Sequence, residues 1–361
     1  ADLMTTSDGV SSSGLYGFKN RIINGAMVID QRNAGASTTP ADSAYTLDRW
    51  KYFASQASKF TVQQNAGSVT PPAGFSNYLG MTVASAVTVG AGDYFTISQL
   101  MEGFNTADLG FGTANAKTIT ISAWVRSSLT GTFGGVVLNS AANRSYPFTY
   151  SIPTANTWTQ ISVTITGDTS GTWIGATNGT GLRIDFSLGA GSTYSGTASA
   201  WAGATYLSAT GATSVVGTNG ATFYITGVQL EKGSTATSFD YRPFGTELQL
   251  CQRYYEKSFA QATAPAYNAS FNFTTGTIYS GTSISIPIIP FKVTKRAAPT
   301  MTFYGVSTSG WRYYAGGFAN LTSFSGSAQD SYFYAEGSGT SGLSQYQSSI
   351  IGGNWTAEIE L

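Results

Sequence analysis

The sequence predicts an all-β protein: an antiparallel β-sandwich, a short helix, and then a second, smaller β domain. Glycine accounts for 43 of the 361 residues and aromatic residues for 14%, a composition typical of short strands joined by tight turns. Short runs alternate apolar and polar residues with a period of two and are separated by Gly, Asn, Ser and Thr. Only one stretch, beginning at Thr246, shows helical spacing.

The first domain should contain a series of short strands with regular alternation. They are expected at 79–83, 95–97, 118–126, 160–166 and 181–188, after a first strand within 21–30 that is broken at Asn24-Gly25. The alternation of 118–126 turns Trp124 outward, away from the apolar row. Strands at this spacing favour two packed antiparallel sheets.

The stretch from Ala221 to Ser258 closes this domain. Gly227 interrupts an apolar row that resumes one residue out of step, which predicts a β-bulge. A helix then follows, because Thr246 and Gln249 have capping-box spacing. Its apolar stripe is expected to comprise Leu248, Cys251 and Tyr255, with the single cysteine of the chain buried.

Beyond the helix the period of two returns. Strands are expected at 271–279, 283–289, 300–304, 310–314, 331–336 and 354–361. Pro287 and Pro290 place the second of these strands at a sheet edge or bound it with bulges. The sequence therefore divides into an arm (1–19), a β-sandwich (20–245), and a linker helix with a C-terminal β domain (246–361).

Charge and hydropathy exclude several classes of partner. Only 10% of the residues are charged, and 18 basic residues balance 18 acidic ones. Without a basic field we expect no nucleic-acid partner, and without an apolar run of about 20 residues no membrane insertion. A surface so poor in charge suits a subunit of an oligomer. No signal peptide opens the sequence, so we expect synthesis and assembly in a reducing cytoplasm.

The residues needed for catalysis are sparse. The chain has no histidine, which removes the commonest general base and the commonest metal ligand. Its carboxylates are scattered, and Asp185 is interpreted as a solvated ion-pair partner of Arg183. We therefore expect no enzymatic activity, no catalytic residues, no cofactor and no metal.

Three strings resemble a jelly-roll module found in bacteriophage tail proteins. They are NRIINGAMVIDQRNAG at 20–35 with TLDRW at 46–50, the stretch from Asn156 through Tyr194 to Trp201, and GVQLEKGSTATSFDYRPFGTELQLCQRYYEK at 227–257. Together they span about two thirds of the chain. Related carbohydrate-binding modules often hold a structural calcium next to an acidic residue of the last strand, but Gly227 stands at that position here.

This resemblance implies a virion protein with a jelly-roll fold. The expected function is that of a tail-fibre or receptor-binding component that is homotrimeric and attaches to host surface glycan, with the arm contacting other virion proteins. A capsid fibre or decoration subunit is the alternative, and a polysaccharide depolymerase is less favoured because no catalytic motif is present.

Aromatic residues in polar surroundings are the remaining candidates for ligand contact, because flat rings stack on the C–H faces of sugars. The candidates are Trp311, Tyr313, Tyr314, Tyr332 and Tyr334 in the C-terminal domain, and Trp173 and Tyr194 in loops of the sandwich. The C-terminal cluster fits either a subunit interface or a ligand surface. Trp158 and Trp201 are expected to pack against the core.

Overall fold

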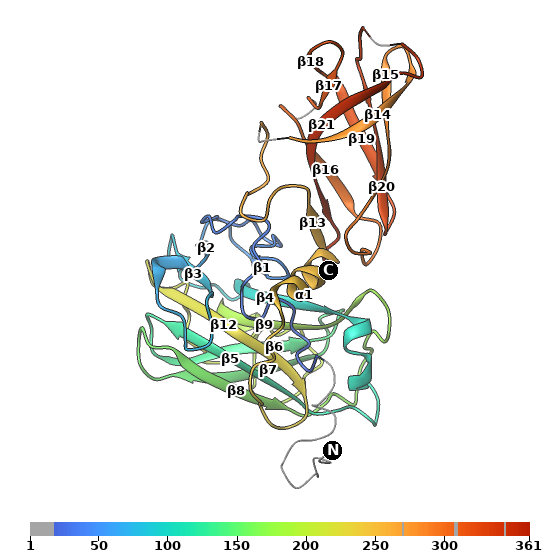
Figure 1. The fold of residues 1–361 in the computed structure, drawn as a ribbon. Helices are drawn as coiled ribbons and strands as arrows, with labels where there is room; N and C mark the ends of the chain where they lie inside the picture. The colour runs from blue at the N-terminus through green and yellow to red at the C-terminus, as the bar shows by residue number, and fades with distance from the viewer. Residues whose placement is uncertain (1–17, 269–270, 307–309, 343) are drawn as a thin grey trace, which may run out of the picture.

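The protein consists of two β bodies joined by a short helix. A computed structural model describes residues 18–268, 271–306, 310–342 and 344–361. The expected arm lies almost entirely outside these residues. Figure 1 shows the sandwich, coloured blue to yellow, and beyond it a second body, coloured orange to red. Helix α1, strand β13 and the C-terminus lie at the junction between the two.

The first body is an antiparallel jelly-roll sandwich, as expected. One sheet has the order β1 (Lys51–Ala54), β4 (Tyr94–Glu102), β9 (Thr180–Ala190), β6 (Gly131–Leu138), β7 (Ser145–Ile152). The other has the order β2 (Phe60–Gln64), β3 (Leu79–Val83), β12 (Thr222–Lys232), β5 (Ile119–Ser127), β8 (Thr159–Ile165). The parallel pair β10 (Ser195–Gly196) and β11 (Ser208–Ala209) and four short 3-10 turns lie in the connections: η3 (Ala66–Ser68), η4 (Gly103–Asn105), η5 (Ala107–Leu109) and η6 (Ser192–Tyr194).

The inward rows of these strands form one continuous core. Its largest fully buried rings include Phe60, Phe95, Phe133, Phe186 and Phe223. The alternation seen in the sequence thus assigns the core faces of β3, β4, β5, β8 and β9 correctly, and Trp124 is turned outward and half-buried.

The segment 21–30 forms no strand, contrary to expectation. Asn24 and Met27 have left-handed backbones with φ of 58°, which interrupts the extended run. Side chains hold the segment instead: Asn24 donates to the carbonyls of Ile29 and Asp48 and accepts the N–H of Ile29.

The bulge expected at Gly227 is confirmed. The pairing of β12 with β5 shifts register between Thr226 and Gln229. Gly227 has φ of 61°, and a Cβ there would lie 2.6 Å from the ring of Phe75. Only glycine meets both demands at this position.

Helix α1 (Phe244–Gln252) begins two residues before the expected start. Its N-cap is Pro243 and the expected capping box does not form. Tyr255 does not belong to the helical stripe but to strand β13 (Tyr255–Lys257). Cys251 is fully buried, as expected, and burial raises the pKa of its thiol. Within the described ranges no helix has the length and apolar character needed to cross a membrane.

The second body is organised around its long last strand, β21 (Ser348–Glu358). The beginning of β21 pairs with β14 (Asn272–Ser280) and β17 (Arg312–Tyr314), and its end pairs with β13 and β16 (Thr300–Tyr304). In the sheet, β18 (Phe318–Asn320) lies next to β17. On the other side, β14 is followed by β15 (Ser283–Pro290), β20 (Tyr332–Ser338) and β19 (Ser323–Ala328). β15 is therefore not an edge strand. The two prolines accompany a register shift between Ile286 and Ile289, which is the bulge alternative.

Ion pairs from the end of the chain join the two bodies. Glu360, just beyond β21, accepts hydrogen bonds from Arg32 and from Arg49, which is 1% exposed. The Arg49 guanidinium also lies over the ring of Tyr254, at 3.6 Å from its centroid. Since Arg32 and Arg49 belong to the first body, the last residues of the second are tied to it by charge.

A second buried network lies beside the first. Glu102 of β4, 1% exposed, accepts from Arg253 at 2.6 and 2.8 Å and from the hydroxyl of Tyr254 at 2.7 Å. Burial raises the pKa of Glu102, but the bonds from Arg253 and Tyr254 outweigh it and hold the pKa below its usual value. Strand β4 is thereby attached to the segment that follows α1.

Candidate functional site

Two of the aromatic candidates are core residues. Trp311 is 3% exposed and Tyr313 is 1% exposed. The indole of Trp311 stacks on Phe324 with ring centroids 4.1 Å apart and 7° between the planes. The expectation that Trp311 and Tyr313 form a ligand surface is therefore wrong, because Tyr313 of β17 and Trp311 just before it both face the interior.

The other three C-terminal tyrosines point outward but do not form one group. Tyr314 is 45% exposed, Tyr334 is 47% exposed, and Tyr332 is half-buried. Tyr314 lies on β17, whereas Tyr332 and Tyr334 lie on β20, and β21, β14 and β15 separate these strands in the sheet. Closeness in sequence therefore does not translate into one site.

The loop candidates of the sandwich pack against neighbouring rings. Trp173 makes edge contacts with Phe111 and Trp201 at centroid distances of 4.8 and 5.6 Å. Tyr194 makes an edge contact with Tyr94 at 5.2 Å. Trp201 packs against the main core, which confirms its expected role. Trp158 likewise packs beside Tyr78, with its indole N–H bonded to the carbonyl of Thr70.

A polar face with two exposed tyrosines lies on β14, β15 and β20. Sequence reasoning singled out Tyr334 but missed Tyr279 and the face that the two share. We call it the tyrosine face and define it by Thr277, Tyr279, Ser285, Tyr334 and Glu336. Thr277 pairs with Ser285, which pairs with Glu336, so these three form a row across the strands. The Tyr279 hydroxyl donates to Glu336 at 3.0 Å.

The rings of this face bracket the carboxylate. On their own strands Tyr279 and Tyr334 each stand two residues from the central row, about 7 Å along the strand and in opposite directions. Both rings are nearly half exposed, 45% for Tyr279 and 47% for Tyr334. The sequence did contain a signal that Tyr279 is exposed. The alternation of 271–279 places Tyr279 in the same outward row as Thr275 and Thr277.

A neighbouring outward surface is apolar. Phe273, Tyr314, Phe318 and Ile350 are each about half exposed, and Phe318 lies 5.5 Å from Phe273 and 5.4 Å from Tyr314 between ring centroids. Phe273 covers Gly352, where a Cβ would lie 2.4 Å from the ring. Phe273, Phe318 and Ile350 offer no hydrogen-bonding group, so of these four side chains only Tyr314 can bond a sugar hydroxyl, and the surface is less suited to a sugar than the tyrosine face.

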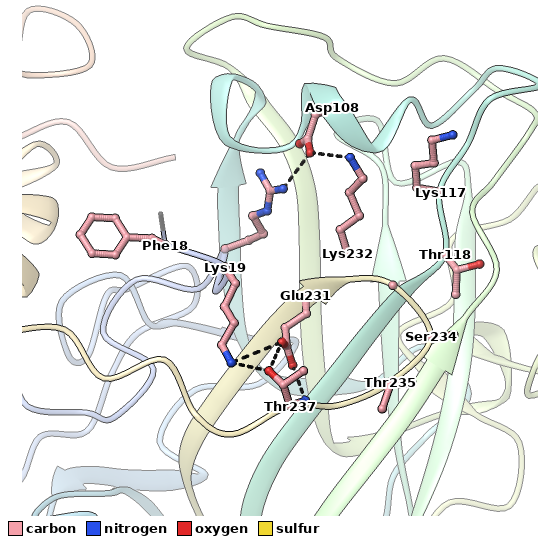
Figure 2. A pocket seen from close by; sticks show the side chains of 12 residues that line it. Phe18, Lys19, Asp108, Lys117, Thr118, Glu231, Lys232, Ser234, Thr235 and Thr237 are labelled. Atoms are coloured by element: carbon pink, nitrogen blue, oxygen red, sulfur yellow. Dashed lines mark hydrogen bonds and ion pairs between the residues drawn. The ribbon is translucent and has the colours of Figure 1, made fainter. Parts of the chain in front are cut away.

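A charged groove of about 730 Å³ lies on the sandwich, where β12 ends (Figure 2). Its lining residues are Phe18, Lys19, Arg21, Asp108, Lys117, Thr118, Glu231, Lys232, Gly233, Ser234, Thr235 and Thr237. The groove has the size of ordinary ligand pockets, which measure roughly 300–1,000 Å³.

A second hollow is too small for a ligand of that class. Phe75, Phe239 and Tyr241 pack on one another with centroids 4.9–5.5 Å apart beside a pocket of about 120 Å³. Since Phe75 also covers Gly227, these rings stabilise the bulge of β12.

Asp185, singled out in the sequence, and Asp240 are both held in structural contacts. Asp185 receives two bonds of 2.6 Å from Arg183, as expected, but it is fully buried rather than solvated. Asp240 accepts the backbone N–H groups of Lys19 and Asn20 at 3.1 and 3.2 Å. Across the described residues, no three His, Cys, Asp or Glu side chains gather closely enough to hold a metal ion.

Comparison with known proteins finds no matching family model and no matching curated sequence. Among solved structures, the chain is similar to the enzymatically active domain of tailspike protein 4 of bacteriophage CBA120, with 13% identity and a TM-score of 0.32 over 60% of this chain. The match spans only 22% of that tailspike chain.

Carbohydrate-binding modules are also among the similar structures. TmCBM61, in complex with β-1,4-galactotriose, has 10% identity and a TM-score of 0.30 over 59% of this chain and 99% of its own. The family 11 module of Clostridium thermocellum, in complex with a mixed-linked tetrasaccharide, has 10% identity and a TM-score of 0.28 over 55% and 98%. At these identities the similarity concerns the fold alone.

Proposed function

We propose that this chain is a non-enzymatic, receptor-binding component of a bacteriophage tail, and that its tyrosine face binds host surface glycan. The observation that carries the proposal is the pair of half-exposed rings, Tyr279 and Tyr334, on either side of the Glu336 carboxylate. Each ring offers a flat surface for the C–H face of a sugar, and Glu336, Ser285 and Thr277 offer partners for its hydroxyls.

The geometry of the face suits an extended chain rather than a single buried sugar. The two tyrosines stand on the outer two of three neighbouring strands, and their backbone positions are offset by about 14 Å along the strand direction, which is the length of a few linked sugars. An open, flat surface of this kind binds a polymer by several weak contacts. The phage assignment is supported by the sequence strings at 20–35, 46–50 and 227–257.

The test is binding of purified host polysaccharide to single variants. Tyr279→Ala and Tyr334→Ala should each weaken binding about 2- to 10-fold, because a stacked ring contributes about 0.5–1.5 kcal/mol beyond its buried area. Tyr267→Ala is the matched control, since Tyr267 is 43% exposed in the same body but lies outside the face.

Two outcomes would contradict the proposal. Unchanged binding by a folded Tyr279→Ala/Tyr334→Ala double variant would exclude the tyrosine face. Release of new reducing ends from the polysaccharide would contradict the non-enzymatic assignment. The same face could serve a fibre or decoration subunit of the capsid, and antibody labelling of intact virions distinguishes head from tail.

A further inference from the structure

The charged groove of Figure 2 concentrates charge in a chain that has very little of it. Of the 36 charged residues in the sequence, six line this one groove. Four of the six are cations, Lys19, Arg21, Lys117 and Lys232, and two are carboxylates, Asp108 and Glu231. The groove therefore carries a surplus of two positive charges in a protein whose formal net charge is zero.

The Glu231 carboxylate is fully engaged within the protein. Glu231 is 4% exposed and accepts from the side chains of Thr237 and Gln229 and from the backbone N–H of Thr237. The ammonium of Lys19 lies 3.9 Å from Glu231 and donates to the hydroxyl of Thr237, as Figure 2 shows. This pair fixes the wall of the groove and leaves little charge for a ligand.

The Asp108 carboxylate is shared between two cations. Arg21 contacts it at 2.8 Å and Lys232 at 3.3 Å, so one negative charge faces two positive ones. Burial raises the pKa of Asp108, but the bonds and charges of Arg21 and Lys232 outweigh it and lower the pKa overall. Lys232 remains 44% exposed and free to turn toward a ligand.

Lys117 supplies the second available cation. Its side chain is exposed, it borders the same groove as Lys232, and it has no ion-pair partner among the described residues. Its position is fixed by the backbone, because the N–H of Lys117 donates to the carbonyl of Leu109 at 2.8 Å. The strand end opposite is fixed likewise, with the N–H of Gly233 bonded to the carbonyl of Thr118.

We propose that this groove is a second glycan subsite that binds an anionic sugar, through Lys117 and Lys232. The inference rests on the proposed function and narrows it to polysaccharides that carry carboxylate or phosphate groups. The hydroxyls of Thr118, Ser234, Thr235 and Thr237 line the same groove and match the hydroxyls of a sugar. An anion here gains charge-assisted bonds that a neutral hexose cannot form.

The experiment titrates the full-length protein with glucuronate, glucose 1-phosphate and glucose, followed by calorimetry or ligand-observed NMR. We expect one or both anionic sugars to bind and glucose not to bind. Binding should weaken as salt rises from 50 to 500 mM, because an exposed ion pair is screened. The two anionic probes distinguish a carboxylate ligand from a phosphate ligand.

Variants that remove positive charge and a variant that removes negative charge should have opposite effects on binding. Lys117→Gln/Lys232→Gln should weaken binding of the anionic sugar tenfold or more, whereas Lys59→Gln, just before β2 and outside the groove, should leave it unchanged. Asp108→Asn should tighten binding, because it removes the competing negative charge and keeps the side-chain shape. Absence of binding by either anionic sugar, or equal affinity in the double lysine variant, would overturn the proposal.

The failure of this inference is distinguishable from failure of the proposed function. If neutral polysaccharide still binds and depends on Tyr334 while the anionic sugars do not bind, only the groove is excluded. If the anionic sugars bind through the two lysines but no polysaccharide depends on Tyr279 or Tyr334, the groove stands and the tyrosine face does not.

Discussion

Replacement of Trp311 by alanine should destabilise the second body rather than remove a ligand contact. The indole is 3% exposed, stacks on Phe324, and makes an edge contact with Phe303 at 5.8 Å. It also lies flat against Gly353, where a Cβ would come within 2.2 Å of the ring. The backbone cannot collapse into the space that such a ring leaves.

The expected magnitude follows from this environment. Truncation of a buried tryptophan to alanine costs about 3–5 kcal/mol, and the poor scope for collapse favours the upper half of that range. For a body of roughly 100 residues, about 1 kcal/mol shifts the melting temperature by about 4–8 °C. We therefore expect Trp311→Ala to lower the melting temperature of the second body by about 16–40 °C.

Differential scanning calorimetry provides the measurement. The transition of the sandwich should be far less affected, since its core is separate from the one that contains Trp311. Tyr314→Ala, at an exposed position three residues further along the chain, is the control and should shift melting by only a few degrees. A Trp311→Ala protein that melts like wild type yet no longer binds polysaccharide would refute the reasoning and restore Trp311 as a ligand residue.

Two further predictions concern assembly and pH. Sedimentation or mass photometry should give about three times the chain mass of 37.8 kDa, and a single monomer species over micromolar dilution would contradict a trimer. Burial raises the pKa of Asp48 to about 6, so the folded protein favours the protonated carboxyl. Its contribution to the free energy of unfolding is therefore complete below about pH 4 and is lost as the pH rises through 6. The Asp48→Asn variant cannot ionise at this position, so it should not lose this contribution. Measured by chemical denaturation, its unfolding free energy minus that of wild type should increase by about 2–3 kcal/mol from pH 4 to pH 7. A difference that stays constant with pH would exclude this titration.

The regular strands could be predicted from the sequence, and the irregular ones could not. β3, β5 and β8 alternate cleanly, so their inward faces are readable without structure. β6 and β7 were missed because Gly134, Gly135 and Pro147 interrupt the alternation. The glycines are needed for packing, since a Cβ at Gly135 would lie 2.4 Å from the ring of Phe148. Tertiary contacts rather than local preference decide such positions.

The candidate site was predicted only in part, for a similar reason. The crowding of Trp311, Tyr313 and Tyr314 suggested a single surface, but residues one apart on a strand face opposite ways. Which face is inward depends on the pairing of β17 with β21, which no local pattern reveals. Tyr334 was found but its partner Tyr279 was not, because 55 residues separate them in sequence and only the pairing of β14, β15 and β20 brings them to one face.

The junction between the two bodies determines how the tyrosine face can act. A buried ion pair such as Arg49–Glu360 adds little net stability, but loss of one partner would leave an uncompensated charge at a site that is almost fully buried. Other relative orientations of the two bodies would break the Arg49–Glu360 and Glu102–Arg253 pairs and therefore have a higher free energy. In a trimer, three tyrosine faces held in fixed positions would bind one polymer with a high effective concentration after the first contact. If the proposed trimer forms and the tyrosine face binds glycan, rigid coupling of this kind would allow individually weak sugar contacts to sum to firm attachment.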